Sequence, residues 1–251
     1  MRALVLAAGY ATRLYPLTRD RPKHLLPVGG RPMLEYLFER LGPIDALDGV
    51  WLVTNGRFAE QFRSWAAGYD PPRRELRPTI VDDGTTSEDD RLGAIGDLGL
   101  VLEREHVDDD LIVVAGDGMF SESLEEFGRF CAGRETPVLA VYDVGDLEAI
   151  KRYSSIAVDD DGRIVDFEEK PERPTSTLAG IALYYYPRTV FPLIRQYLDE
   201  GNNPDQPGRL VQWLYPRVPV HTWQVPGRWF DIGSPDTLAE ADRAFTETAQ
   251  S

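Results

Sequence analysis

The chain has 251 residues, of which 42% are hydrophobic and 27% charged, so it is long enough to bury a substantial core. Its formal net charge of −15 argues against nucleic acid or an anionic membrane surface as a partner. A single cysteine, Cys131, excludes an intrachain disulfide, and no apolar run approaches the ~18 residues of a membrane span. We therefore expect a cytoplasmic protein.

Apolar strands alternate with amphipathic helices through the first half of the chain. We expect strands at 2–7, 50–54, 79–82 and 111–115, and helices after Pro32, around 58–65, around 92–102 and over 124–131. This alternation predicts right-handed βαβ units and a mostly parallel sheet. Cys131 lies on an apolar helical stripe, which predicts that it packs in the core.

The second half of the chain has a different pattern. Residues 155–168 predict a hairpin that turns at Asp160-Asp161-Gly162, followed by a strand over 180–186 and a helix near 187–200. The GNNPDQPG segment, 201–208, predicts a loop, and Ser234 predicts the N-cap of a final helix. Because no linker-like stretch separates the halves, we expect a single domain over 1–251.

The segment LAAGYATRLYPLTRDRPKHLLPV, residues 6–28, suits an anionic ligand. Its small residues let backbone N–H groups approach a phosphate, while Arg13 offers a planar fork and Lys23 a point charge. Residues 1–33 carry a local charge of +5 within a chain of −15. The carboxyl end of a first strand is where open α/β sheets bind such ligands, although a glycine turn with solvated charges is the simpler alternative.

This segment resembles the signature of the sugar-1-phosphate nucleotidyltransferases, a Gly-rich loop followed by T-R-L-x-P-L-T and P-K-x-L-L-P-V. Ala11 departs from the glycine that is common in that family. Four further segments resemble the family's motifs in the same order, although Asp97 replaces a small apolar residue in the first of them. They are Gly93–Leu98, Gly116-Asp117, Phe167–Pro171 and Gly227–Ser234.

The resemblance implies an α/β fold in three layers, with a mostly parallel twisted sheet, helices on both faces and a sugar-binding β extension. It implies a Rossmann-like, GT-A-like nucleotidyltransferase with a nucleotide-binding half over 1–135 and a sugar-phosphate-binding half over 136–251. The implied reaction is Mg²⁺-dependent transfer of a nucleotidyl group from a nucleoside triphosphate to a sugar 1-phosphate, which releases pyrophosphate.

The same resemblance assigns roles to individual residues. Arg13 and Lys23 are the expected catalytic residues, and Asp117 and Asp231 the expected Mg²⁺ ligands. Two of the chain's three lysines, Lys23 and Lys170, occupy motif positions that require an ammonium group. The expected nucleotide-binding residues are Leu6, Ala7, Ala8, Gly9, Tyr10, Ala11, Thr12, Arg13, Lys23 and Gly93. The expected sugar-phosphate-binding residues are Asp117, Tyr153, Glu169, Lys170 and Gly180.

Other interpretations remain open from the sequence. Singly, Asp117 could be a turn residue and Asp231 a brace for the last helix. A cytidylyl- or guanylyltransferase acting on a non-hexose or non-sugar phosphate is an alternative function, as is a non-catalytic nucleotide-sensing homologue. Ser154 stands where the family usually has glycine and could crowd a sugar contact. The nucleobase is not specified, and we expect a monomer or homodimer.

Overall fold

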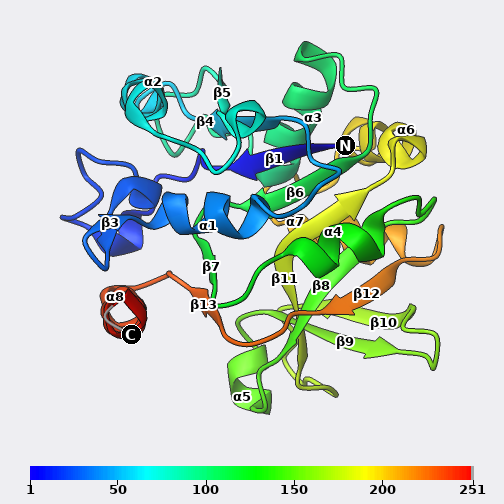
Figure 1. Cartoon of the computed structure of the whole chain (residues 1–251). Coiled ribbons are helices and arrows are strands. Elements are labelled where there is room, and N and C mark those ends of the chain that lie inside the picture. Colours follow the sequence, from blue (N-terminus) through cyan, green and yellow to red (C-terminus); the bar gives the residue numbers. More distant parts are fainter. Residues whose placement is uncertain (250–251) are drawn as a thin grey trace.

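A seven-stranded sheet forms the centre of the protein (Figure 1), in a computed structural model that describes residues 1–249. Within this sheet β11 alone runs antiparallel to both of its neighbours, β6 and β8, while the remaining pairs are parallel. The predicted mostly parallel α/β sheet is therefore confirmed. In spatial order the strands are β12 (His221–Gln224), β8 (Val138–Asp143), β11 (Leu178–Tyr186), β6 (Leu111–Ala115), β1 (Arg2–Leu6), β4 (Val50–Thr54) and β5 (Thr79–Asp82).

Helices cover both faces of the sheet, which gives the predicted three layers. Along β1, Ala3 and Val5 belong to one buried cluster and Leu4 to another, as the alternation of a strand requires. The first cluster contains side chains of α1 (Met33–Leu41), α2 (Ala59–Gly68) and α4 (Glu125–Cys131). The second contains side chains of α3 (Ala94–Arg104), α6 (Phe191–Asp199) and α7 (Pro207–Leu214). Cys131 is fully buried in the first cluster, as predicted.

Several short elements escaped the sequence analysis. The segment 201–208 was expected to be entirely loop, but α7 begins at Pro207, with a proline in its first turn. The three-residue strands β7 (Gly118–Phe120) and β13 (Trp229–Asp231) pair with each other and were not predicted. Strand β12 was also missed, because its sequence HTWQ lacks an apolar run. Strands this short have no recognisable periodicity.

The remaining elements pack around the sheet. Strands β9 (Ser154–Val158) and β10 (Ile164–Glu169) form the predicted hairpin. Helix α8 (Pro235–Ala249) lies beside β13 and the short strand β2 (Pro27–Val28), as Figure 1 shows. Ser234 caps α8 as predicted, since its Oγ accepts the Thr237 N–H at 3.2 Å. The other short elements are β3 (Arg31–Pro32), α5 (Leu147–Ile150) and the 3₁₀ turns Thr12–Leu14, Lys23–Leu25, Arg74–Leu76 and Arg188–Val190.

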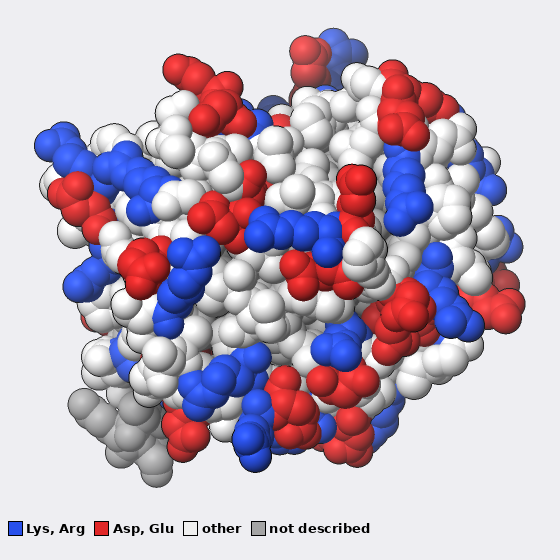
Figure 2. Space-filling model, turned by 90° about the horizontal axis from the view of Figure 1, so that it is seen from above, with Lys and Arg blue, Asp and Glu red and all other residues white. Residues whose placement is uncertain are grey.

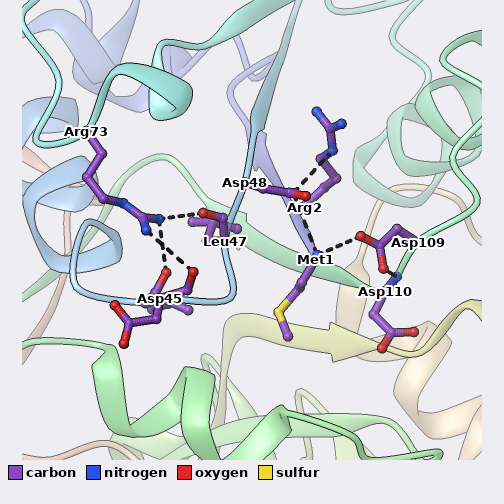
Figure 3. Close-up of polar contacts among 9 residues, drawn as sticks. Met1, Arg2, Asp45, Leu47, Asp48, Arg73, Asp109 and Asp110 are labelled. Carbon is purple, nitrogen blue, oxygen red and sulfur yellow. Dashed lines mark hydrogen bonds and ion pairs between the residues drawn. The ribbon is translucent and has the colours of Figure 1, made fainter.

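A group of ion pairs closes the end of the sheet where β1, β4 and β6 begin (Figure 3). The Met1 amino group lies 2.6 Å from Asp109, and Arg2 lies 3.4 Å from Asp48. Asp110 accepts hydrogen bonds from the Tyr185 hydroxyl at 2.9 Å and the Arg188 N–H at 3.0 Å. We call these five residues, Met1, Arg2, Asp48, Asp109 and Asp110, the amino-end cluster. Asp109 and Asp110 are therefore held by specific contacts, although the composition of the three consecutive aspartates at 108–110 alone suggests a solvated turn.

Charges of both signs are interspersed over the face that Figure 2 shows. Oppositely charged side chains also pair individually in this protein, since Arg91 lies 3.1 Å from both Glu88 and Asp205. The acidic excess of the chain therefore does not form one continuous negative surface on this face. Within residues 1–249, none of the helices combines the length and apolar character that crossing a membrane requires.

Candidate active site

The chain leaves β1 through a loop of small residues at the carboxyl end of the sheet. The Ala7 N–H donates to the Val53 carbonyl at 2.9 Å, and the Asn55 amide donates to the Ala8 carbonyl at 2.8 Å. Among the described residues, no acceptor is bonded to the backbone N–H groups of 8–11. We call residues 8–13 the phosphate loop, because free N–H groups at such a position form an anion site.

The backbone conformation of Ala11 explains why the related family commonly has glycine at this position. Its backbone is left-handed, with φ 48° and ψ 45°, a conformation that a Cβ atom disfavours by roughly 1 kcal/mol. The Thr18 hydroxyl donates to the Ala11 carbonyl at 2.8 Å and braces this turn. Alanine in place of glycine therefore adds backbone strain to the phosphate loop. Tyr10 is buried and its hydroxyl lies 3.3 Å from the Thr85 hydroxyl.

Lys23 and Asp117 form an ion pair at the end of β6. The Lys23 Nζ donates to Asp117 Oδ2 at 2.5 Å, and the lysine side chain is only 9% exposed. The 3₁₀ turn that carries Lys23 packs closely on Gly116, where a Cβ would lie 2.8 Å from the His24 ring. Burial would raise the pKa of Asp117, but the Lys23 ammonium, His24 and the hydrogen bonds to the carboxylate together hold that pKa below its usual value.

Asp231 is brought to the same place by the pairing of β7 with β13. In that ladder Asp231 stands opposite Gly118, the residue after Asp117. Desolvation and the negative charge of Asp117 raise the pKa of Asp231, while the more distant charges of Lys23 and Arg13 oppose the shift. Two carboxylates that repel each other in this way are a suitable site for a divalent cation.

A cavity of about 180 Å³ adjoins Asp231 and contains most of the residues predicted to bind a sugar phosphate. Tyr153, Glu169 and Gly180 all line it. Trp229 forms part of its wall and packs edge-to-face on Tyr153, with ring centroids 5.6 Å apart. We call it the Glu169 cavity. Its lining residues are Leu139, Arg152, Tyr153, Ser154, Phe167, Glu169, Gly180, Ile181, Ala182, Tyr184, Pro207, Gly208, Trp229 and Asp231.

Glu169 is held against the first turn of α7. A Cβ on Gly208 would meet its carboxylate at 2.0 Å, so only glycine leaves room for this contact. Burial raises the pKa of Glu169, and the positive charges of Lys170 and Arg209 oppose that shift. Lys170 itself has a left-handed backbone with φ 50°, and its N–H donates to the Tyr153 carbonyl at 2.7 Å. Its exposed ammonium forms no ion pair with any described residue.

Two of the predicted site residues have environments that the sequence did not suggest. The Gly180 N–H, expected to help bind a sugar, already donates to the Ser154 hydroxyl at 2.9 Å. Gly93 does not line the Glu169 cavity; it packs on the loop before α7, where a Cβ would lie 2.6 Å from the Pro204 carbonyl oxygen. Gly93 has φ 80°, which accounts for glycine at the N-cap of α3.

Arg152, Trp229 and Gly208 are among the cavity residues that were not assigned from the sequence. Arg152 directly precedes Tyr153, and Trp229 lies inside the motif that contains Asp231, so both could have been suspected from their neighbours. Gly208 gave no signal, because it belongs to a segment that was predicted to be loop. Its role follows only from the contact with Glu169 across the fold.

Comparison with known proteins agrees with this geometry. A sequence profile of the family described as nucleotidyl transferase matches residues 2–248 of the chain. The bifunctional protein GlmU of Methanocaldococcus jannaschii is 26% identical over 246 residues, which cover 97% of this chain and 54% of that protein. The chain therefore spans about half the length of this relative.

A second relative has nearly the same length. The UTP–glucose-1-phosphate uridylyltransferase AglF of Haloferax volcanii is 25% identical, over 98% of this chain and 97% of that protein. Among solved structures, a UDP-glucose pyrophosphorylase complexed with UDP-glucose superimposes with a TM-score of 0.80 at 22% identity, covering 98% of each chain. At that identity the superposition establishes a shared fold, and it agrees with the layered sheet described above.

Proposed function

The chain belongs to the nucleotidyl transferase family, and on that premise we propose that it transfers a nucleotidyl group from a nucleoside triphosphate to a sugar 1-phosphate. The products are a nucleoside diphosphate sugar and pyrophosphate. One observation carries the proposal: the phosphate loop, the Lys23–Asp117 pair and the Glu169 cavity follow one another along the carboxyl side of the sheet, with Asp231 joining them. The names of two relatives support the proposal. One is a uridylyltransferase that the chain covers over 97% of its length, and the other is GlmU, which it covers over 54%.

The phosphate loop and its neighbours would bind the triphosphate. The free N–H groups of 8–11 point to phosphate binding, and Arg13, which forms no ion pair with a described residue, is available for the pyrophosphate. Lys23, held by Asp117, would face the α-phosphate. These groups stabilise the charge that develops as the bond between the α- and β-phosphates breaks.

The Glu169 cavity would bind the acceptor. Glu169 would accept hydrogen bonds from sugar hydroxyls, and Lys170 would pair with the acceptor phosphate. An oxygen of that phosphate attacks the α-phosphorus as pyrophosphate leaves on the opposite side. Since the attacking oxygen is already anionic near neutral pH, no side chain has to remove a proton, and positioning supplies the catalysis.

A divalent cation fits the carboxylates of Asp117 and Asp231. Burial and repulsion from Asp117 raise the pKa of Asp231, and a bound cation would relieve that repulsion. Both are hard oxygen ligands of the kind that Mg²⁺ prefers, and a Mg²⁺ ion keeps further positions for water and phosphate oxygens. When bound, Mg²⁺ would neutralise phosphate charge during the transfer. Among residues 1–249 no cluster of three or more potential metal ligands provides a competing site.

We also propose a division of labour within the sheet. Residues 1–135 would bind the nucleotide and residues 136–251 the sugar phosphate. In support of this, β11 of the second half lies between β6 of the first half and β8 of the second half. The two groups of residues are therefore neighbours in the sheet at β6 and β11. A monomer or homodimer that binds neither nucleic acid nor membrane remains our expectation.

The function is tested by offering the purified chain each of the uridine, thymidine, cytidine and guanosine triphosphates with a panel of sugar 1-phosphates. We expect Mg²⁺-dependent release of pyrophosphate with at least one pair, together with formation of the nucleoside diphosphate sugar. D117N serves as the matched inactive control. Release that occurs only with a non-sugar phosphate such as phosphocholine would contradict the proposed acceptor, and no release with any pair would contradict the activity.

A further inference from the structure

The floor of the Glu169 cavity contains a serine whose hydroxyl is fixed by the backbone. Ser154 is 2% exposed, and its Oγ accepts the Gly180 N–H at 2.9 Å. The space around Gly180 is tight, since a Cβ there would lie 2.9 Å from both Ser154 Oγ and Leu139 Cδ2. The Ser154 hydroxyl oxygen therefore has one well-defined position in the cavity wall, fixed by the Gly180 N–H.

The hydrogen of this hydroxyl has no acceptor within residues 1–249. A serine hydroxyl can donate one hydrogen bond and accept two. The Gly180 N–H uses one of the two acceptor positions and leaves the donor unused. A buried donor without a partner is unfavourable. Because Ser154 lines the cavity, an oxygen atom of a bound ligand is the natural partner for that hydrogen.

The adjacent Ser155 shows what a purely structural serine looks like in this strand. Its Oγ accepts the N–H groups of Thr175 and Ser176 at 3.3 and 3.1 Å, and it donates to the Ser176 carbonyl at 3.3 Å. Successive side chains of a strand point to opposite sides, so Ser155 faces away from the cavity. Both hydroxyls are buried, but only that of Ser154 keeps an unused donor.

We propose that Ser154 is a specificity-determining residue of the acceptor site, donating its hydroxyl hydrogen to one hydroxyl oxygen of the sugar ring. This inference rests on the proposed function. The acceptor class is then a single-ring sugar 1-phosphate with a free hydroxyl at the position above Ser154. A cavity of about 180 Å³, below the 300 Å³ or so at which drug-sized ligand sites begin, suits one ring. Glu169 accepts from a second hydroxyl, so the ring is held between a donor and an acceptor.

The test compares wild type with S154A on a sugar 1-phosphate that wild type uses and on each of its monodeoxy analogues. In wild type, one analogue should lose about tenfold or more in kcat/KM, because its missing hydroxyl leaves Ser154 without a partner. In S154A the parent sugar should fall by about tenfold to the level of that analogue, and the analogue itself should be unchanged. The KM for the nucleoside triphosphate should stay the same in both enzymes.

S155A is the matched control, since it removes a neighbouring buried hydroxyl and should keep the wild-type ranking of the analogues. S154G removes the same hydroxyl with a smaller residue, and calorimetric titration of the parent sugar 1-phosphate into it gives a second measurement should S154A fold poorly. Equal losses for the parent and every analogue in S154A, or no loss at all, would overturn the inference. If wild type used no sugar 1-phosphate, the proposed function itself would fail first, and the two failures are thereby distinguishable.

Discussion

The two ends of the central sheet differ in whether their charged groups have partners within the protein. At the amino end, the Met1 amino group, Arg2 and Asp110 each have a partner within the protein. At the carboxyl end, Arg13 and Lys170 have no ion-pair partner among the described residues. The first arrangement satisfies polar groups where parallel strands begin, and the second leaves them available for a ligand.

Asp109 and Asp231 show the same contrast among the carboxylates, whereas Asp117 at the carboxyl end is paired with Lys23. Asp109 lies beside a cation, which lowers its pKa despite the opposing effect of burial, whereas burial and the neighbouring Asp117 carboxylate both raise the pKa of Asp231. Binding sites commonly tolerate such unfavourable contacts because the ligand relieves them. We therefore expect substitutions at the amino end to change stability, and substitutions at the carboxyl end to change activity.

The largest effect is expected from D231N. Removing one of the two proposed Mg²⁺ ligands should lower kcat/KM by roughly 10³-fold or more, measured as pyrophosphate release at saturating Mg²⁺. Without Mg²⁺, the variant should unfold at the same or a higher urea concentration than wild type, because the repulsion from Asp117 is gone. Near-normal turnover by D231N would contradict the metal assignment, and a large loss of stability would contradict the contrast between the two ends.

The next effect concerns Lys170, whose backbone is left-handed. K170A and K170G both remove the ammonium, and both should lower kcat/KM for the sugar 1-phosphate by about 10²-fold while the KM for the triphosphate changes little. K170G should nevertheless be more stable than K170A by about 1 kcal/mol, since glycine adopts φ 50° without a Cβ clash. Urea unfolding of the pair measures the strain separately from the charge. Equal losses for both substrates would place Lys170 outside the acceptor site.

Much of this site could be predicted because its motifs are local. Arg13, Lys23 and Lys170 lie in contiguous segments, and the strand-helix alternation placed the first segment at the carboxyl end of the sheet. The contacts that could not be predicted join segments that are far apart in the sequence. The bond between Gly180 and Ser154, and the packing of Gly208 on Glu169, join segments separated by 26 and 39 residues, and no local pattern reports them.

The amino end was predicted less well for a related reason. Three consecutive aspartates at 108–110 have the composition of a solvated turn, and that interpretation was natural from the sequence. The partners of Asp109 and Asp110 are Met1, Tyr185 and Arg188, which only the order of strands in the sheet brings to the same edge. Short strands such as β7 and β13 were missed because pairing, and not periodicity, defines them.

D110N tests the amino end directly. The amide keeps one oxygen but loses the charge that accepts from the Tyr185 hydroxyl and the Arg188 N–H, so the free energy of unfolding should fall by about 1–3 kcal/mol. The kcat and both KM values should remain those of wild type when measured well below the unfolding temperature. Y185F, which removes one of the two donors, should show a smaller loss of stability. A changed KM for the sugar 1-phosphate in D110N would break the contrast between the ends.

The smallest effect comes from an acid pair that belongs to neither end's pattern. Asp97, only 4% exposed in α3, shares a hydrogen bond with Asp83, and burial together with the Asp83 charge raises its pKa to about 8. Folded protein therefore holds a proton that unfolded protein releases above about pH 4. The contribution of Asp97 to stability is complete below that pH and is lost progressively as the pH rises to about 8.

D97N keeps a hydrogen-bond donor toward Asp83 and removes the titration. Its unfolding free energy, relative to wild type, should rise steadily between pH 5 and pH 8, because wild type loses the stabilisation from its bound proton over that range. Urea unfolding at four or five pH values measures this slope, and D83N should show a similar one because the two carboxyl groups share a proton. A difference that stays constant with pH would mean that the pair is not protonated in the folded protein. The pair would then be a second place near the carboxyl end where two like charges lie close together and are available for a ligand.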